Sequence, residues 1–202
     1  MTLANIPPIH KNKTTLAYLA GKCATFFSHP PTQAGIKARH AALTHLPFDR
    51  GRILDALTDQ NSADGGTEAT HRNLEKIKDP ASVFITTGHQ PCLGGGPLFV
   101  AYKILTAVKL AKYVEATLNV PAIPLFWLAT DDEDVEEVVD TTAPGLKTLR
   151  FDAKDYKGVV GRMDSPVSQL KELPPLEGKT WGEYHRRLIH KFFGRFGMVI
   201  AD

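Results

Sequence analysis

The sequence predicts an α/β protein whose core is a parallel sheet. Three segments support this prediction. A strand, a glycine-rich loop and a long helix follow one another over residues 82–116, and a second buried strand follows at residues 122–129. After a further helix, the apolar run at residues 198–201 indicates another buried strand. Strands that alternate with helices in this way usually pair in parallel, with a helix crossing from one strand to the next.

The pattern divides the chain into four regions. Residues 1–80 are expected to form a helical region that packs on the core, with helices in TTLAYLAGKCATFF, GRILDALTDQ and EATHRNLEKIK and a break at NSADGG. Residues 81–140 hold the core itself. Residues 141–180 form a small inserted segment, in which LKTLRFD and GVVGRM have strand-like patterns among Pro and Gly. Residues 181–202 return to the core as a helix and a strand, and we interpret the chain as incomplete because no helix follows to cover that strand.

The composition is that of an ordinary globular protein. Of the 202 residues, 43% are hydrophobic and 23% are charged, and the net charge is +2 at pH 7. These values give no reason to expect nucleic acid or a membrane surface as a partner. The N-terminal residues lack the apolar core of a signal peptide, no apolar run has the length of a membrane span, and two cysteines do not make a disulfide framework. We therefore predict a cytoplasmic protein.

The loop after the first strand predicts an anion-binding site. Val83–Thr87 is a β-branched and aromatic run, which Gly88 is expected to end. The three glycines at 94–96 allow turns that a Cβ would forbid, and Pro97 occupies the expected first position of the helix. The start of that helix offers unpaired N–H groups and a positive dipole end to an anion. The glycine spacing matches neither the dinucleotide-binding motif nor the phosphate loop, so it does not identify a nucleotide.

The second strand, AIPLFWLA, leads directly into an acidic run. The carboxylates of this run are Asp131, Asp132, Glu133, Asp134, Glu136 and Glu137. Ligands of open α/β sheets bind outside the carboxyl ends of the strands. Because the glycine loop and the acidic run both follow such ends, we expect them to face one crevice. The alternative is a solvated acidic turn that also caps a helix, since carboxylates are favoured in a first helical turn.

Four residues of the loop and helix have both a functional and a structural interpretation. His89 is expected to donate to a phosphate oxygen or a developing charge, and the alternative is a loop imidazole bonded to backbone. Gln90 either binds a ribose or substrate hydroxyl or makes a hydrogen bond within the loop. Lys103 shares the buried side of its helix, so its ammonium either contacts an anion or extends to solvent. Cys92 has no evident base near it in the sequence, and we expect it to be inert.

No metal site is predicted from the residues themselves. His40 and His45, like His185 and His190, are five residues apart and would not face one another on a helix. The acidic run lacks the pattern of a calcium loop. It is compatible with Mg²⁺ held through a nucleotide, although nothing in the sequence requires this.

These segments resemble the bacillithiol biosynthesis cysteine-adding enzymes, also called cysteine ligases. The resemblance rests on TTGHQPCLGGGPLFVAYKILTAVKLAK, on VPAIPLFWLATDDEDVEEV and, more loosely, on HKFFGRFGMVIAD. It covers most of residues 84–140 and the last dozen residues, and it corresponds to the N-terminal portion of the family protein. It implies a Rossmann-like core akin to nucleotidyltransferases, with inserted connecting segments, and a C-terminal coiled coil that is absent here.

The resemblance also implies an activity. The family joins L-cysteine, through its carboxyl group, to the amine of glucosaminyl-malate in the last step of bacillithiol biosynthesis. ATP or ADP is the implied cofactor, because amide formation from a free carboxylate is uphill in water and an acyl-phosphate or acyl-adenylate must form first. Mg²⁺ is compatible with this chemistry. The implied partners are these small molecules, and the resemblance is compatible with an oligomer of the full-length family protein.

Two motifs depart from the family pattern. The family has Gly-Gln-Gln where this chain has Gly88, His89 and Gln90, and Glu-Asp-His-Asp where it has residues 131–134. Glu133 thus replaces a histidine, and its charge would repel phosphate unless a metal ion or Lys103 intervened. The family protein is also more than twice as long as this chain.

We assign roles on the first of three hypotheses, a cysteine ligase that uses a nucleotide-activated carboxyl group. The second hypothesis is a nucleotidyl-transfer enzyme that adenylates another carboxylic acid, and the third is a non-catalytic module that binds a nucleotide or a sugar. The predicted catalytic residues are His89, Asp131, Asp132 and Asp134. The predicted cofactor-binding residues are Gly88, His89, Gln90, Gly94, Gly95, Gly96 and Lys103. The predicted substrate-binding residues are Trp127, Asp132 and Glu137.

Overall fold

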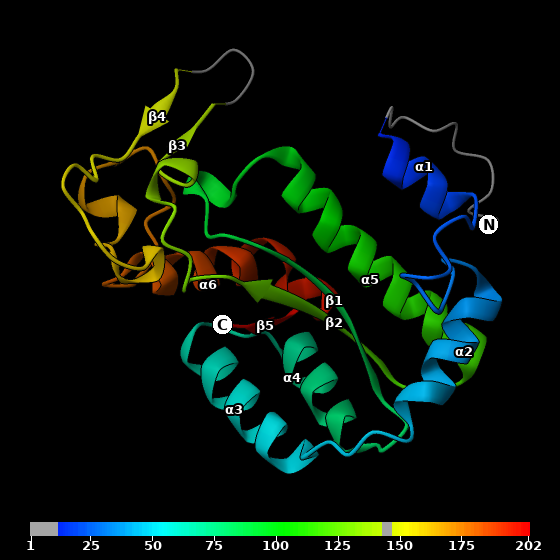
Figure 1. Cartoon of the computed structure of the whole chain (residues 1–202). Helices are drawn as coiled ribbons and strands as arrows, with labels where there is room; N and C mark the ends of the chain where they lie inside the picture. Colours follow the sequence, from blue (N-terminus) through cyan, green and yellow to red (C-terminus); the bar gives the residue numbers. More distant parts are fainter. Residues whose placement is uncertain (1–11, 143–146) are drawn as a thin grey trace. The chain divides into compact units, whose positions relative to one another are not determined.

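The computed structural model describes residues 12–142 and 147–202 (Figure 1). The chain forms two compact units, residues 1–48 and 49–202, which are described separately below. The helical region predicted for residues 1–80 contributes to both units.

The first unit contains two short helices. α1 (Lys13–Leu19) begins after Asn12, whose side chain accepts hydrogen bonds from the first turn, and α2 (Gln33–Leu43) follows. The sequence predicted helix throughout residues 14–27. That prediction is wrong beyond the end of α1, where Gly21 adopts a left-handed conformation with a φ of 71°.

The second unit is built around a parallel sheet, which has three strands within the described residues. In spatial order the strands are β1 (Val83–His89), β2 (Ala122–Leu128) and β5 (Val199–Ala201). β1 pairs with β2 along its whole length, whereas β5 pairs with Leu125–Trp127 alone. The predicted strands and their parallel pairing are confirmed.

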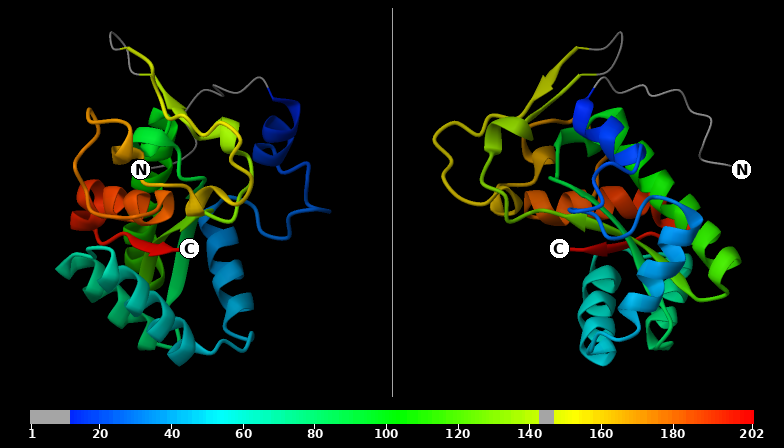
Figure 2. Two further views of the ribbon diagram at one scale, coloured as in Figure 1. Left: turned by 90° about the vertical axis from the view of Figure 1, so that its left-hand side faces the viewer. Right: turned by 45° about the vertical axis from the view of Figure 1, so that its right-hand side comes forward.

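Helices cover both faces of this sheet (Figures 1 and 2). One layer consists of α5 (Leu98–Leu118) and α6 (Trp181–Phe193), and the other of α3 (Arg50–Ala63) and α4 (Glu68–Glu75). Phe126 and Leu128 of β2 pack in the cluster that contains α5 and α6, while Ile123 and Leu125 pack with α3 and α4. Successive β2 side chains thus serve opposite layers, as the pleat of a strand requires. No helix within the described ranges has both the length and the apolar composition of a bilayer span.

The prediction that Gly88 ends the first strand is wrong. β1 continues through Gly88 and His89, which pair with Trp127 and Leu128. A Cβ on Gly88 would lie 2.7 Å from the carbonyl oxygen of Trp127. Glycine is therefore needed here because the two strands approach closely, and not because the chain turns.

Two helix boundaries also differ from the prediction. Pro97 has a ψ of 152° and precedes the helix, so α5 begins one residue later. α3 continues through the first three residues of NSADGG, because the buried side chain of Asn61 bonds both backbone groups of Ile200 in β5, at 2.8 and 2.9 Å. The break comes only at Asp64 and the glycines after it.

The inserted segment forms a small hairpin followed by irregular chain. β3 (Asp140–Thr141) pairs antiparallel with β4 (Leu149–Arg150), which confirms a strand within LKTLRFD, although Leu146 lies outside the described residues. GVVGRM is not a strand, since η5 (Val160–Arg162) is a 3₁₀ turn. Val160 of this turn and the following Met163 join a cluster around Trp181. The other 3₁₀ turns are η2 (Lys76–Lys78), η3 (Leu93–Gly95), η4 (Val135–Glu137), η6 (Pro166–Ser168) and η7 (Gly194–Phe196).

Candidate functional site

The carboxyl ends of β1 and β2 bring the two predicted site segments together. The backbone N–H of Ala129 donates to the carbonyl oxygen of His89 at 3.1 Å. The side-chain amide of Gln90 donates to a carboxylate oxygen of Glu137 at 3.0 Å. The loop after β1 and the acidic run after β2 are therefore neighbours, as expected for adjacent parallel strands.

Lys103 brings a positive charge to this edge of the sheet. Its Nζ donates to the carbonyl oxygen of Gly88 at 2.6 Å and lies 5.7 Å from the centre of the Phe99 ring. The side chain leans towards the N-terminal end of α5, which is the usual direction for long helical side chains. An ammonium group has three N–H donors, so this contact leaves donors for an anion.

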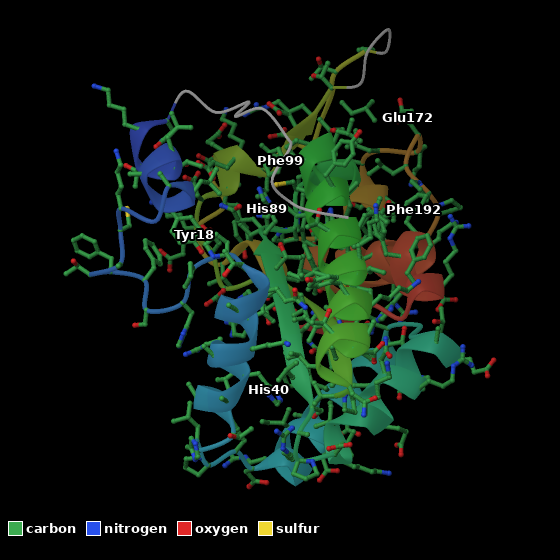
Figure 3. The ribbon with its side chains drawn as sticks, turned by 90° about the vertical axis from the view of Figure 1, so that its right-hand side faces the viewer. Tyr18, His40, His89, Phe99, Glu172 and Phe192 are labelled. Atoms are coloured by element: carbon green, nitrogen blue, oxygen red, sulfur yellow. The ribbon has the colours of Figure 1, made fainter. Side chains whose placement is uncertain are left out.

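The imidazole of His89 lies between the β1 loop and the start of α5 (Figure 3). Its Nδ1 is 3.2 Å from the carbonyl oxygen of Gln90 and 3.5 Å from the Sγ of Cys92, and its ring meets that of Phe99 edge-on at 5.2 Å. The statement that Cys92 has no base near it is therefore wrong. Burial, together with Glu137 and Asp132, raises the pKa of Cys92 to about 11, so its thiol is protonated at neutral pH, as expected of an inert cysteine.

The carboxylates of the acidic run divide into those that organise the loop and those that face solvent. Asp132 accepts a hydrogen bond from the backbone N–H of Asp134 at 2.8 Å, and Glu136 pairs with Arg150 at 2.6 Å. The run leads into the single turn η4, which has no side-chain cap. In the described parts of the chain, the exposed carboxylates of Asp131, Glu133 and Asp134 form no salt bridge.

Trp127 and the inserted segment border the same strand end. The side chain of Trp127 is 51% exposed although its neighbours in β2 are buried. The insertion also contacts this strand end, where the N–H of Gly161 donates to the carbonyl oxygen of Thr130 at 2.9 Å. A Cβ on Gly161 would lie only 2.4 Å from the Cβ of Thr130. The insertion thus closes off one side of the acidic run.

The triple glycine lies at the start of α5 but opens towards α6. All three residues have positive φ, with values of 68°, 92° and 82° for Gly94, Gly95 and Gly96. They line a groove of about 390 Å³ whose other walls are mostly apolar side chains of α5 and α6, and Arg195 is the one charged residue in its lining. α5 has no side-chain cap, so the N–H groups of its first turn keep their capacity to bind an anion.

Comparison with known proteins gives a consistent result. The family model described as "Bacillithiol biosynthesis BshC, N-terminal Rossmann-like domain" matches residues 1–175. A relative from Bacillus cytotoxicus is 33% identical over 208 residues, which cover 90% of this chain and 39% of the relative. A relative from Geobacillus kaustophilus is 35% identical, with coverages of 91% and 35%, and one from Cytophaga hutchinsonii is 26% identical, with coverages of 95% and 39%. Each of the three is named "Putative cysteine ligase BshC".

This chain belongs to the BshC family. The resemblance and the Rossmann-like fold predicted from the sequence are confirmed. The matched region spans only 35–39% of the length of these three relatives.

In this BshC-family chain, α6 holds the β1 loop in place, which the sequence analysis missed. The indole Nε1 of Trp181 donates to the carbonyl oxygen of Pro91. Thr180 and Glu183 form a capping box that begins α6 at Trp181, and this T-x-x-E pattern was a visible signal. One turn later, the Nδ1 of His185 lies 2.7 Å from the carbonyl oxygen of Trp181, and burial lowers the pKa of His185 to about 4.

A second group of residues at this edge was also missed. Asp202, directly after β5, accepts a hydrogen bond from the hydroxyl of Thr130 and pairs with Arg186. Arg186 also pairs with the buried carboxylate of Asp64 at the end of α3. No local pattern predicts this network, because its members come from four separate parts of the chain.

The exposed charged residues at the strand ends are the ones that could hold a cofactor or its metal ion. Within residues 12–142 and 147–202, no three His, Cys, Asp or Glu side chains are grouped to hold a metal ion. Mg²⁺ at phosphate sites usually needs only one or two carboxylates, with water and phosphate completing its shell. The exposed Asp131 and Asp134, with the free donors of Lys103, suit that arrangement.

Proposed function

We propose that this chain forms part of a ligase that joins L-cysteine, through its carboxyl group, to the amine of glucosaminyl-malate. One structural observation carries the proposal. Lys103 and the exposed carboxylates of Asp131 and Asp134 belong to the same pair of strand ends. This edge therefore offers charges of both signs to substrates that are themselves anionic and amine-bearing. Family membership supports the same activity.

In this proposal, the cationic and the anionic residues of the site bind different groups of the ligands. Lys103 and the first turn of α5 bind anionic oxygens, and His89 donates to the oxygen on which charge develops. Asp131 and Asp134 bind the amine or a nucleotide-borne Mg²⁺. A nucleotide, ATP or ADP, would supply the free energy that activation of the carboxyl group requires. The positive charge of Lys103 attracts the phosphate and so offsets its repulsion by the carboxylate of Glu133.

The remaining assigned residues shape the site. Gln90 and Glu137 already form a hydrogen-bonded pair, which a sugar hydroxyl can join. Trp127, near the end of β2, offers an exposed ring to a substrate. Asp132 stabilises the turn of the acidic loop by accepting the hydrogen bond from Asp134. Gly88 allows the backbones of β1 and β2 to approach closely, and the triple glycine allows the backbone of the loop to turn.

A deletion experiment tests the whole proposal. Removing the gene that encodes this chain from its own organism should abolish bacillithiol and cause glucosaminyl-malate to accumulate, as measured by mass spectrometry of the thiol pool. Return of the gene should restore bacillithiol, and a copy with Lys103→Gln should restore it poorly. Lys109→Gln is the matched control, because Lys109 is exposed on the same helix. Normal bacillithiol in the deletion strain would overturn the proposal, and pyrophosphate release with other carboxylic acids would then favour adenylation of a different substrate.

A further inference from the structure

A second cavity lies at the opposite end of β2, away from the strand ends that bear the candidate site. It is open to solvent and has a volume of about 310 Å³. β5 pairs only with Leu125–Trp127, so within the described residues no strand borders Ala122–Pro124 on that side. α4 and α5, which cover opposite faces of the sheet, both line the cavity there. The cavity therefore exists because the sheet is short at this corner.

Positive charge is concentrated around this cavity. Its cationic lining residues are Arg72, Lys76, Lys112 and Arg195. Glu115, the one carboxylate of the lining, pairs with Lys76 at 2.5 Å, and Arg72 pairs with Glu68 outside the cavity. Across residues 12–142 and 147–202, Lys112 and Arg195 have no carboxylate partner. The cavity thus keeps two cations whose charges the protein does not balance.

Helix dipoles explain only part of this charge. Arg72 lies in the last turn of α4 and Lys76 directly follows that helix, where cations stabilise the negative dipole end. Lys112 precedes the last turn of α5, which contains no basic residue. Arg195 lies two residues beyond the end of α6, where its charge also suits the negative dipole end, and it lies over the ring of Phe196, 4.7 Å from its centre. Lys112 is therefore the cation that helix dipoles leave unexplained.

We propose that this cavity binds a small organic phosphate. An ammonium and a guanidinium group together match the charge and the acceptor oxygens of a phosphate dianion. The lining also includes the apolar residues Val108, Ala111 and Pro124, which suit a carbon skeleton. The volume lies at the lower end of the range for small-molecule sites, and a cleft with one sign of charge concentrates its counter-ion. This site does not depend on the activity proposed for the strand ends, although Arg195 also lines the groove beside the triple glycine.

Calorimetric titration of the chain with phenyl phosphate at low ionic strength tests the proposal. Saturable binding is expected, and Lys112→Gln and Arg195→Gln should each weaken it about fivefold, the upper end for an exposed ion pair. Lys109→Gln is the matched control for charge on α5 and should not change the affinity. Lys103→Gln removes the cation proposed to bind anions at the strand ends, so it reports on binding there, and any weakening that it causes should be smaller than that of Lys112→Gln or Arg195→Gln. All four side chains are at least partly exposed, so circular dichroism should show an unchanged fold.

Three outcomes would overturn the proposal. One is the absence of saturable binding at millimolar phenyl phosphate. A second is equal weakening by Lys109→Gln, which would mean diffuse attraction to charge, and a third is weakening by Lys103→Gln alone, which would place the ligand at the strand ends. Benzyl alcohol, inorganic phosphate and succinate test the ligand class. Each should bind more weakly than phenyl phosphate, and a tighter complex with any of them would refute an organic phosphate.

Discussion

The loop after β1 and the loop after β2 lie side by side, yet they are built in opposite ways. The β1 loop is fastened from several directions: Cys92 and Leu93 are buried, the N–H of Leu93 donates to Val138 at 2.8 Å, and Trp181 bonds Pro91. The β2 loop leaves most of its carboxylates in solvent. Rigid segments position a site while exposed polar groups contact the ligand. Changes in the first loop should therefore cost stability, and changes in the second should affect ligands.

The largest expected effect comes from the tryptophan that fastens the β1 loop. Trp181 is fully buried, and its ring meets that of Phe151 edge-on at 5.0 Å. Trp181→Ala should lower the free energy of unfolding by about 3–5 kcal/mol, because it removes this packing and leaves the Pro91 carbonyl without its donor. Urea denaturation followed by circular dichroism measures the change.

The second tryptophan of the chain serves as a control. Trp181 supports the β1 loop, whereas Trp127 lies in β2, just before the β2 loop. Trp127 is 51% exposed, so Trp127→Ala should cost about 1 kcal/mol or less. Equal losses for the two variants would mean that α6 does not hold the β1 loop in the way described here.

Acid should destabilise the support beneath the β1 loop. Burial lowers the pKa of His185 from 6.5 to about 4, and the Nδ1 contact with a carbonyl oxygen places the proton of the neutral ring on that nitrogen. Between these two pKa values the unfolded chain binds a proton that the folded chain does not. The free energy of unfolding should therefore fall as the pH drops from 6.5 to 4, by about 3 kcal/mol in total for this residue, and then level off.

Denaturation at a series of pH values measures this slope, the change in the free energy of unfolding with pH. His190 has its pKa lowered to about 4 by burial as well, so His185→Leu should remove about half of the slope. His45→Gln, at an exposed position, should leave it unchanged. An undiminished slope in His185→Leu would assign the acid sensitivity to other groups.

A smaller effect is expected where the two strands meet. Gly88→Ala places a Cβ 2.7 Å from the Trp127 carbonyl oxygen, and relief requires the strands to separate. We expect a loss of about 1–3 kcal/mol in the free energy of unfolding. Gly51→Ala is the matched control, because its Cβ would meet nothing closer than 3.7 Å and alanine favours a helix, so this variant should be neutral or more stable. Similar losses in both would show that the close approach at Gly88 has no special cost.

The local sequence pattern was sufficient to predict the strands and their pairing, but not the tertiary contacts around the sheet. The apolar runs at residues 83–87, 122–129 and 198–201 each predict a buried strand, and the rule for parallel strands then places the β1 loop beside the acidic run. GVVGRM was mistaken for a strand because its valines are apolar. In the structure Val160 is buried, and its N–H donates to the carbonyl oxygen of Asp132 at 2.7 Å, so tertiary packing decides the turn.

The candidate site was only partly predictable from the sequence, because several of its contacts also depend on tertiary packing. Lys103 was placed on the buried side of its helix by periodicity, yet its contact with the Gly88 carbonyl depends on β1 continuing through that glycine. The proximity of His89 to Cys92 depends on how the loop turns between them. The pairing of Arg186 with Asp64 and Asp202 joins distant segments, which a single sequence does not reveal.

The smallest effect on stability, and the most informative one for function, is expected in the β2 loop. Asp131→Asn combined with Asp134→Asn should change the free energy of unfolding by less than about 0.5 kcal/mol per site, because both side chains are exposed and form no salt bridge in the described parts of the chain. The same double variant should lose most Mg²⁺-dependent nucleotide binding in calorimetry. Glu136→Gln, which removes a carboxylate already paired with Arg150, is the control and should keep that binding. A double variant that unfolds would show that the β2 loop is structural like its neighbour, whereas one that folds and binds normally would move the site away from these carboxylates.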